Sequence, residues 1–275
     1  MKILVIGAKG AYGKWLCQIL ESRPKKHLTE YEVKGIDKEE TANILDFRKL
    51  IHDSDVIISA VSLVSSSCIL ESVCENAKKK SLIIDFSSSK KEIWKKLKEC
   101  KSDFLMLHPM CAPPNGSDKI SEKNRVYAID QYRLDERRNG LFYVELKEMM
   151  GGDFIGISIE DHDIIDEMQA ISHSLLLGFA SFLIAATENS SMDYEALKRH
   201  STPVSKFLFT SLERFSKKGN PDTSAKLIEL AIKSRSKPYL SAVKFVSSNQ
   251  FIGVPRFVEK LSKWITRIKR RLFGS

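Results

Sequence analysis

The sequence predicts an α/β fold in which a doubly wound, mostly parallel sheet is followed by an all-helical domain. Short, continuous apolar runs alternate with amphipathic stretches over roughly the first 130 residues. A glycine-rich turn follows the first of these runs. From Asp161 onward, apolar residues recur at helical spacing alone. The 275 residues suffice for two domains, and we expect residues 1–155 to form the first and residues 156–275 the second.

The expected strands are short runs rich in Val, Ile and Leu. Continuous apolarity is typical of strands that are buried on both faces, as in a parallel sheet covered by helices. The strands are Ile3–Ile6, Val33–Ile36, Val56–Val61, Leu82–Asp85 and Phe104–Leu107, and the helices between them are Tyr12–Ser22, Ser66–Lys79 and Lys91–Cys100. This alternation implies right-handed crossovers and a doubly wound sheet.

The second domain is expected to contain only helices. They are Ile164–Ala186, Tyr194–Lys217, Thr223–Lys233, Pro238–Ser247 and Val254–Leu272. The boundary between the domains should lie within residues 151–161. The longest apolar stretch, Leu175–Ala186, is too short and too interrupted to span a membrane.

Charge and cysteine content narrow the class of protein. The net charge of +9 comes from 44 basic and 35 acidic side chains. Nucleic-acid binding would explain the excess, but no aromatic and basic motif accompanies it, so a solvated lysine-rich surface is the preferred interpretation. The basic end of the chain, Trp264–Phe273, is read as a solvated terminal helix, with a membrane surface or an acidic partner as the alternative. Five cysteines without C-x-x-C spacing favour a reducing, cytoplasmic location over a disulfide framework or a zinc site.

Three glycines follow the first strand and open the first helix. Gly7, Gly10 and Gly13 have G-x-x-G-x-x-G spacing, a variant of the commoner G-x-G-x-x-G. Such a turn lets the phosphates of a dinucleotide approach free amides at a helix N-terminus. The alternative is a set of turn glycines without a ligand. The context on both sides favours a Rossmann-type nucleotide site.

Asp37 ends the second strand and indicates which dinucleotide binds. A carboxylate at this point accepts hydrogen bonds from the ribose hydroxyls of NAD and repels the 2′-phosphate of NADP. Lys38 follows directly and offers that phosphate a partner, so NADP remains the alternative. The expected cofactor-binding residues are Gly7, Gly10, Tyr12, Gly13, Asp37 and Val61.

Polar residues follow the fourth and fifth strands. Asp85-Phe86-Ser87-Ser88-Ser89-Lys90 ends the fourth, and His108-Pro109-Met110 ends the fifth. In open α/β sheets, ligands gather at the carboxyl ends of strands, so both segments point to the crevice of the glycines. A histidine held extended by the following proline is a natural base for a hydroxyl proton. The alternatives are a packed strand-end histidine and a helix cap for the serines.

A third polar group lies on the first helix of the second domain. His162, Gln169 and His173 are spaced so that they share one helix face, which favours a face lining a cleft. A solvent-facing stripe is the alternative. No metal site is expected, because two histidines eleven residues apart are not a compact ligand pair.

Together these segments resemble the prephenate dehydrogenase family over roughly residues 1–215. The shared order is a glycine loop, an Asp-x-x-Ser-x-Lys segment, a His-Pro-Met segment, a His-Asp helix start, and then Gln and His on that helix. In this sequence these are Gly7/Gly10/Gly13, Asp85/Ser88/Lys90, His108-Pro109-Met110, His162-Asp163 and Gln169/His173.

The resemblance implies an NAD-dependent oxidative decarboxylation. His108 would be the catalytic base on the substrate's ring hydroxyl, and Ser88 would orient the hydroxyl and the histidine. Gln169, His173 and Lys206 would bind a small dicarboxylate substrate. The family's helical second domain forms a dimer, so the resemblance implies a homodimer.

Two departures from the family pattern leave the substrate open. Lys206, after Ser201-Thr202-Pro203, stands where the family has an arginine, and a lysine lacks the bidentate fork. The interval from His162 to His173 is about one residue short of the family spacing. Arogenate and 4-amino-4-deoxyprephenate are therefore alternative substrates. Two other interpretations of the whole protein remain: a different small-acid dehydrogenase, and a nucleotide-binding relative without catalysis.

Overall fold

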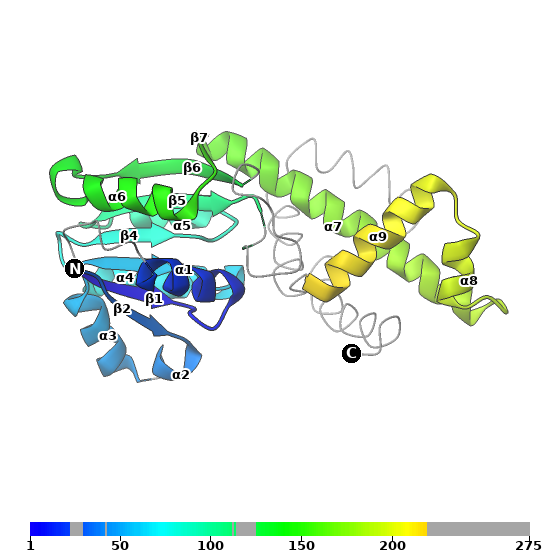
Figure 1. Cartoon of the computed structure of the whole chain (residues 1–275), viewed down its shortest axis with the longest axis horizontal. Helices are drawn as coiled ribbons and strands as arrows, with labels where there is room; N and C mark the ends of the chain where they lie inside the picture. The colour runs from blue at the N-terminus through cyan, green and yellow to red at the C-terminus, as the bar shows by residue number, and fades with distance from the viewer. Residues whose placement is uncertain (23–29, 42, 112, 114–124, 219–275) are drawn as a thin grey trace. The chain divides into compact units, whose positions relative to one another are not determined.

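The computed structural model describes residues 1–22, 30–41, 43–111, 113 and 125–218. The predicted α/β fold with a doubly wound sheet is confirmed (Figure 1). All five expected strands are present, as β1 (Lys2–Ile6), β2 (Glu32–Ile36), β3 (Val56–Ser59), β4 (Leu82–Asp85) and β5 (Asp103–Pro109). They lie side by side in the order β2-β1-β3-β4-β5, and each neighbouring pair is parallel. The chain changes direction across the sheet between β1 and β3, which is where such sheets bind ligands.

Two further strands complete the sheet beyond β5. Strand β6 (Val126–Arg133) runs antiparallel to β5, and β7 (Asp153–Gly156) runs parallel to β6 at the edge. The sequence analysis missed both. Strand β6 carries Asp, Gln and Arg among its residues, and β7 is short and largely exposed, so neither reads as a continuous apolar run.

Helices cover both faces of the sheet. On one face α1 (Ala11–Glu21) and α6 (Glu136–Met150) bury Trp15, Leu16, Phe142 and Leu146 in the same core as β1 and β3. On the other face α3 (Ile44–Asp53), α4 (Leu63–Asn76) and α5 (Lys91–Leu97) do the same. The short helix α2 (Lys38–Thr41) follows β2. Helices α2, α3 and α6 were not expected; α3 has Asn43 as its N-cap and buries only Phe47 and Ile51, a weak apolar signal.

The chain separates into two compact units, Met1–Asp163 and Ile164–Ser275. The sequence analysis places the division after residue 155. The observed division lies inside α7 (Ile159–Glu188), because this one continuous helix begins in the first unit and continues into the second.

In the second unit, α7 is followed by α8 (Tyr194–Arg199) and α9 (Pro203–Lys218). One expected helix over Tyr194–Lys217 is therefore two, since Pro203 cannot continue a helix and begins a new one. Phe209 of α9 packs edge-on against Phe179 and Tyr194, which joins the three helices. The expected helices Thr223–Lys233, Pro238–Ser247 and Val254–Leu272 lie outside the described residues.

Helix α7 is longer and more apolar than the sequence analysis expected. Of the described helices, it is the one that could cross a membrane by length and composition, with a mean hydropathy of 1.7 over 18 residues. One helix of this kind is weak evidence for a membrane span, because the core helix of a soluble protein has a similar length and composition. Only 25% of that window is buried within the chain, so much of its apolar surface is uncovered.

Candidate functional site

The glycine turn has the backbone that a phosphate cradle requires. Gly7 follows β1 with φ +87°, a conformation that favours glycine, and its N–H donates to the carbonyl of Ile36. A Cβ added to Gly7 would lie 2.7 Å from the carbonyl oxygen of Ala60, and one added to Gly13 would lie 2.1 Å from that of Gly7. Gly10 is the N-cap of α1. The turn is therefore closed against β3 by the absence of side chains, and a dinucleotide's phosphates fit at the N-terminus of α1.

Asp37 is held beside this turn. Its carboxylate accepts the backbone N–H of Lys9 at 3.0 Å and that of Lys38 at 2.9 Å, while the Lys9 ammonium pairs with Glu39 at 2.7 Å. The carboxylate expected to bind the ribose thus lies at the carboxyl end of β2, next to the phosphate turn. The structure places Asp37 where the sequence analysis expects it, and the nucleotide choice between NAD and NADP stays a prediction.

Tyr12 and Val61 flank the same turn. Tyr12, in the first turn of α1, donates its hydroxyl hydrogen to the carbonyl of Cys111, and burial raises the pKa of this phenol. Its ring lies 6.3 Å from that of Phe86. Val61 is half-buried beyond β3, and its backbone nitrogen would lie 3.1 Å from a Cβ at Gly7. Tyr12 therefore links the glycine turn to the ends of β4 and β5.

A fully buried ion pair lies at the carboxyl ends of β4 and β5. The Lys90 Nζ donates to the Asp85 carboxylate at 2.6 Å, to the Asp85 carbonyl at 3.1 Å and to the Leu107 carbonyl at 3.2 Å. Neither charged side chain has any exposed surface. The Ser87 hydroxyl donates to the same carboxylate at 2.7 Å. The pair therefore ties the end of β4 to the residue that precedes His108.

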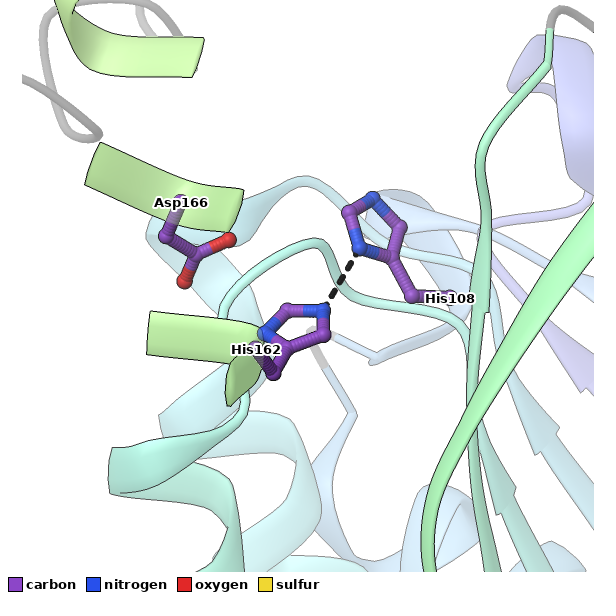
Figure 2. A group of neighbouring side chains, drawn as sticks. All are labelled: His108, His162 and Asp166. Atoms are coloured by element: carbon purple, nitrogen blue, oxygen red, sulfur yellow. Dashed lines mark hydrogen bonds between the residues drawn. The ribbon is translucent and has the colours of Figure 1, made fainter. Parts of the chain in front are cut away.

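His108 contacts a second buried histidine, His162. The Nδ1 of His108 and the Nε2 of His162 are 2.7 Å apart, and the rings meet at 54° (Figure 2). His108 is 5% exposed and His162 is 0% exposed. His162 lies in the first turn of α7, where the Ser158 hydroxyl caps the helix by accepting the N–H of Asp161. The ion pair of Lys91 with Asp163, at 2.7 Å, joins this turn to α5.

The surroundings of the two histidines keep them neutral. Burial, the Lys90 charge and His162 lower the pKa of His108 to about 2. Burial and the Lys90 charge lower the pKa of His162 to about 4. A neutral imidazole is the form that can accept a proton. The neutral His108 can therefore accept a proton, but its surroundings disfavour the charged imidazolium that would result.

The serines of the Asp85–Lys90 segment have different positions. Ser87 and Ser89 are buried, and Ser87 is bonded to Asp85, whereas Ser88 is half-buried. Within the described part of the chain, the Ser88 hydroxyl makes no hydrogen bond to His108. Its expected role in orienting a bound hydroxyl stays a prediction.

The expected substrate-binding residues belong to the second unit. Gln169 and His173 are one turn apart on α7, so they share a face, and burial lowers the pKa of His173. Lys206 is exposed on α9, one turn after Thr202, whose carbonyl accepts its backbone N–H. Their joint role in substrate binding stays a prediction.

Sequence reasoning did not foresee the contact of His162 with His108 or the burial of Lys90. The resemblance names both positions, as the His-Asp helix start and the end of the Asp-x-x-Ser-x-Lys segment. Spacing on a helix groups His162 only with Gln169 and His173. The partner of His162 lies 54 residues earlier on a strand, a distance that no local pattern spans.

Comparisons with known proteins identify the fold. No protein-family model matches the sequence, and no curated protein matches it. The prephenate dehydrogenase of A. aeolicus, solved with hydroxyphenyl propionate and NAD⁺, is 15% identical, with a TM-score of 0.55 over 98% of this chain and 96% of that one. A second structure, of the Aquifex aeolicus enzyme, gives 15% identity and a TM-score of 0.54 over 99% of both chains.

The fold is of the Rossmann type. A 3-hydroxyisobutyrate dehydrogenase of Mycobacterium tuberculosis, solved with L-serine, is also similar, at 13% identity and a TM-score of 0.53 over 97% of this chain and 98% of that one. Because enzymes with different substrates share this arrangement, the likeness establishes the fold, and the reaction has to be argued from the site.

Proposed function

We propose that this protein is a nicotinamide-dependent dehydrogenase that carries out the oxidative decarboxylation of prephenate. The single observation that carries the proposal is His108, buried at the carboxyl end of β5 on the same sheet edge as the glycine turn, where burial lowers its pKa. His162 contacts His108, and Lys90 bonds the carbonyl of the preceding residue, Leu107. The segments that hold these residues follow one another in the order that resembles this family. A hydroxyl oxidation needs such a base and a hydride acceptor.

The residues of the first unit have separate roles in this reaction. The turn of Gly7, Gly10 and Gly13 leaves room for the phosphates of the dinucleotide, and Asp37 accepts hydrogen bonds from its ribose hydroxyls. A nicotinamide cofactor held by these residues would supply the hydride acceptor. His108 takes the ring hydroxyl proton as the hydride leaves the same carbon. Loss of the ring carboxylate as CO₂ then leaves an aromatic product.

The test is a purified-protein assay of NADH and NADPH formation with three substrates side by side. We expect turnover of prephenate, with arogenate and 4-amino-4-deoxyprephenate as the alternatives to be ranked by kcat/KM. Absence of turnover with all three, under conditions where the protein binds the cofactor, would contradict the proposal and favour a non-catalytic nucleotide-binding protein.

The position of Asp37 leads us to expect tighter binding of NAD than of NADP. We expect Asp37→Ser to weaken NAD binding about tenfold to a hundredfold, because charge-assisted hydrogen bonds contribute about 1.5–3 kcal/mol. Isothermal titration of both cofactors measures this. Tighter binding of NADP by the wild-type protein would contradict the prediction and would assign the 2′-phosphate to Lys38.

We expect Lys206 to bind a carboxylate of the substrate. Lys206→Ala should then raise KM by about tenfold to a hundredfold, the loss of one charge-assisted hydrogen bond, while Lys206→Arg retains or improves prephenate turnover. Lys101→Ala, an exposed lysine of the first unit, is the matched control. An unchanged KM in Lys206→Ala with every substrate would make Lys206 a surface residue.

We propose that the protein is a cytoplasmic homodimer that pairs through α7. Ile164, Met168, Leu175 and Phe182 are 63%, 58%, 49% and 63% exposed, and their spacing places them in one stripe along the helix. A stripe of this kind is typical of a face that a second copy covers.

We expect the double variant Leu175→Glu/Phe182→Glu to be monomeric by sedimentation and to remain folded. Leu141→Glu, which charges an equally exposed apolar residue on α6, should leave the dimer intact. A wild-type protein that is monomeric at micromolar concentration, or that partitions into membranes during purification, would contradict the proposed dimer.

A further inference from the structure

The hydrogen bond between His108 and His162 has only one hydrogen. With both rings neutral, either the Nδ1 of His108 or the Nε2 of His162 is the donor over the 2.7 Å that separates them. If His108 is the base, its Nε2 is free of hydrogen. Its Nδ1 then carries the hydrogen and donates it, and His162 is the acceptor.

We propose that His162 holds the substrate's proton during the reaction, and that His108 transfers the proton without keeping it. The inference rests on the proposed function. As the substrate's O–H bond breaks, an N–H bond forms at the Nε2 of His108. The Nδ1–H bond of His108 breaks in turn, and an N–H bond forms at the Nε2 of His162. The positive charge then lies on His162.

The geometry and the electrostatics of the site bear on this direction. Burial and the Lys90 charge lower the pKa of both histidines, and His162 lowers that of His108 further. The geometry gives the direction of transfer, because the hydrogen on the Nδ1 of His108 lies against the Nε2 of His162, 2.7 Å away. The Lys90 ammonium acts against charge on both rings, and it is itself paired at 2.6 Å with the carboxylate of Asp85 at the end of β4. On α7, Asp163 follows His162 directly and pairs with Lys91, and Asp166 follows it by one helical turn.

The chemistry of the proposed reaction requires a place that stores a proton and returns it. The hydride leaves with the electron pair of its C–H bond, and the hydroxyl oxygen becomes a carbonyl oxygen. When the carboxylate leaves as CO₂, the C–C bonding pair enters the ring and that oxygen becomes a phenolate. The phenolate then takes back the proton along the same two histidines. No net proton is released, which suits a pair that is 5% and 0% exposed.

The first experiment separates proton storage from simple orientation. His162→Gln provides an amide oxygen that can accept the Nδ1–H bond of His108 but cannot take up a proton. We expect kcat to fall about 10²-fold or more with KM nearly unchanged, the usual effect of losing an acid–base group. His52→Gln, an exposed histidine on α3, is the control. A wild-type kcat in His162→Gln would reduce His162 to an orienting residue and overturn the proposal.

The second experiment does not depend on turnover. NMR titration of the histidine rings in the wild-type protein, with signals assigned through His108→Asn and His162→Gln, shows which ring is protonated first. We expect His162 to titrate near pH 4 while His108 stays neutral. Protonation of His108 before His162 would overturn the inference. If no substrate is turned over, the proposed function fails, but this titration still decides where the pair holds a proton.

Discussion

Replacing His108 with asparagine is expected to lower kcat by about 10²- to 10⁴-fold, the range for loss of a general base. The asparagine amide keeps a donor near the position of Nδ1, so the contact with His162 has a substitute. No group then replaces Nε2 as the proton acceptor. The fold and the cofactor affinity should change little, because the glycine turn and Asp37 lie on other strands of the sheet.

Steady-state kinetics from pH 6 to 9, with cofactor binding measured by titration, check this prediction. His52→Gln is the control for a histidine substitution outside the site. If His108→Asn turned over prephenate at the wild-type rate across this range, His108 would be a packed strand-end histidine, and the proposed mechanism would be wrong.

The second large effect is expected on stability. Lys90→Met removes one partner of a pair that is 0% exposed on both sides and leaves the Asp85 carboxylate buried without its cation. Breaking a buried pair in this way costs about 3–5 kcal/mol of the free energy of unfolding. The double variant Asp85→Asn/Lys90→Met should recover most of that loss, since it removes the stranded charge as well.

Urea denaturation of the four proteins measures these changes. The matched control is Lys91→Met, which removes the neighbouring lysine. Its side chain is 58% exposed and pairs with Asp163, so the expected loss is about 0–1 kcal/mol. Equal destabilisation by Lys90→Met and Lys91→Met would show that burial of the Asp85–Lys90 pair does not dominate its energetics.

Much of the first unit can be predicted from local sequence. The apolar runs that become β1 to β5 are continuous because helices cover both faces of the sheet, and continuity is visible along the chain. The glycine spacing is also local, because a tight turn of positive φ and a close strand–helix approach need glycine at fixed positions. Strands β6 and β7 escaped prediction because their stability comes from pairing at one side of the sheet, with little apolar signal of their own.

The candidate site shows the same division between local and tertiary information. Local sequence is enough to predict that His108 stands at the end of a buried strand, that three glycines open a helix, and that Lys90 and His162 follow an order that resembles the family. The burial of Lys90 against Asp85 and the contact of His162 with His108 become visible in the folded chain alone. Hydrophobic periodicity records which face of an element is buried. It does not record which distant side chain it meets, because sheet order and the entry angle of α7 set that contact.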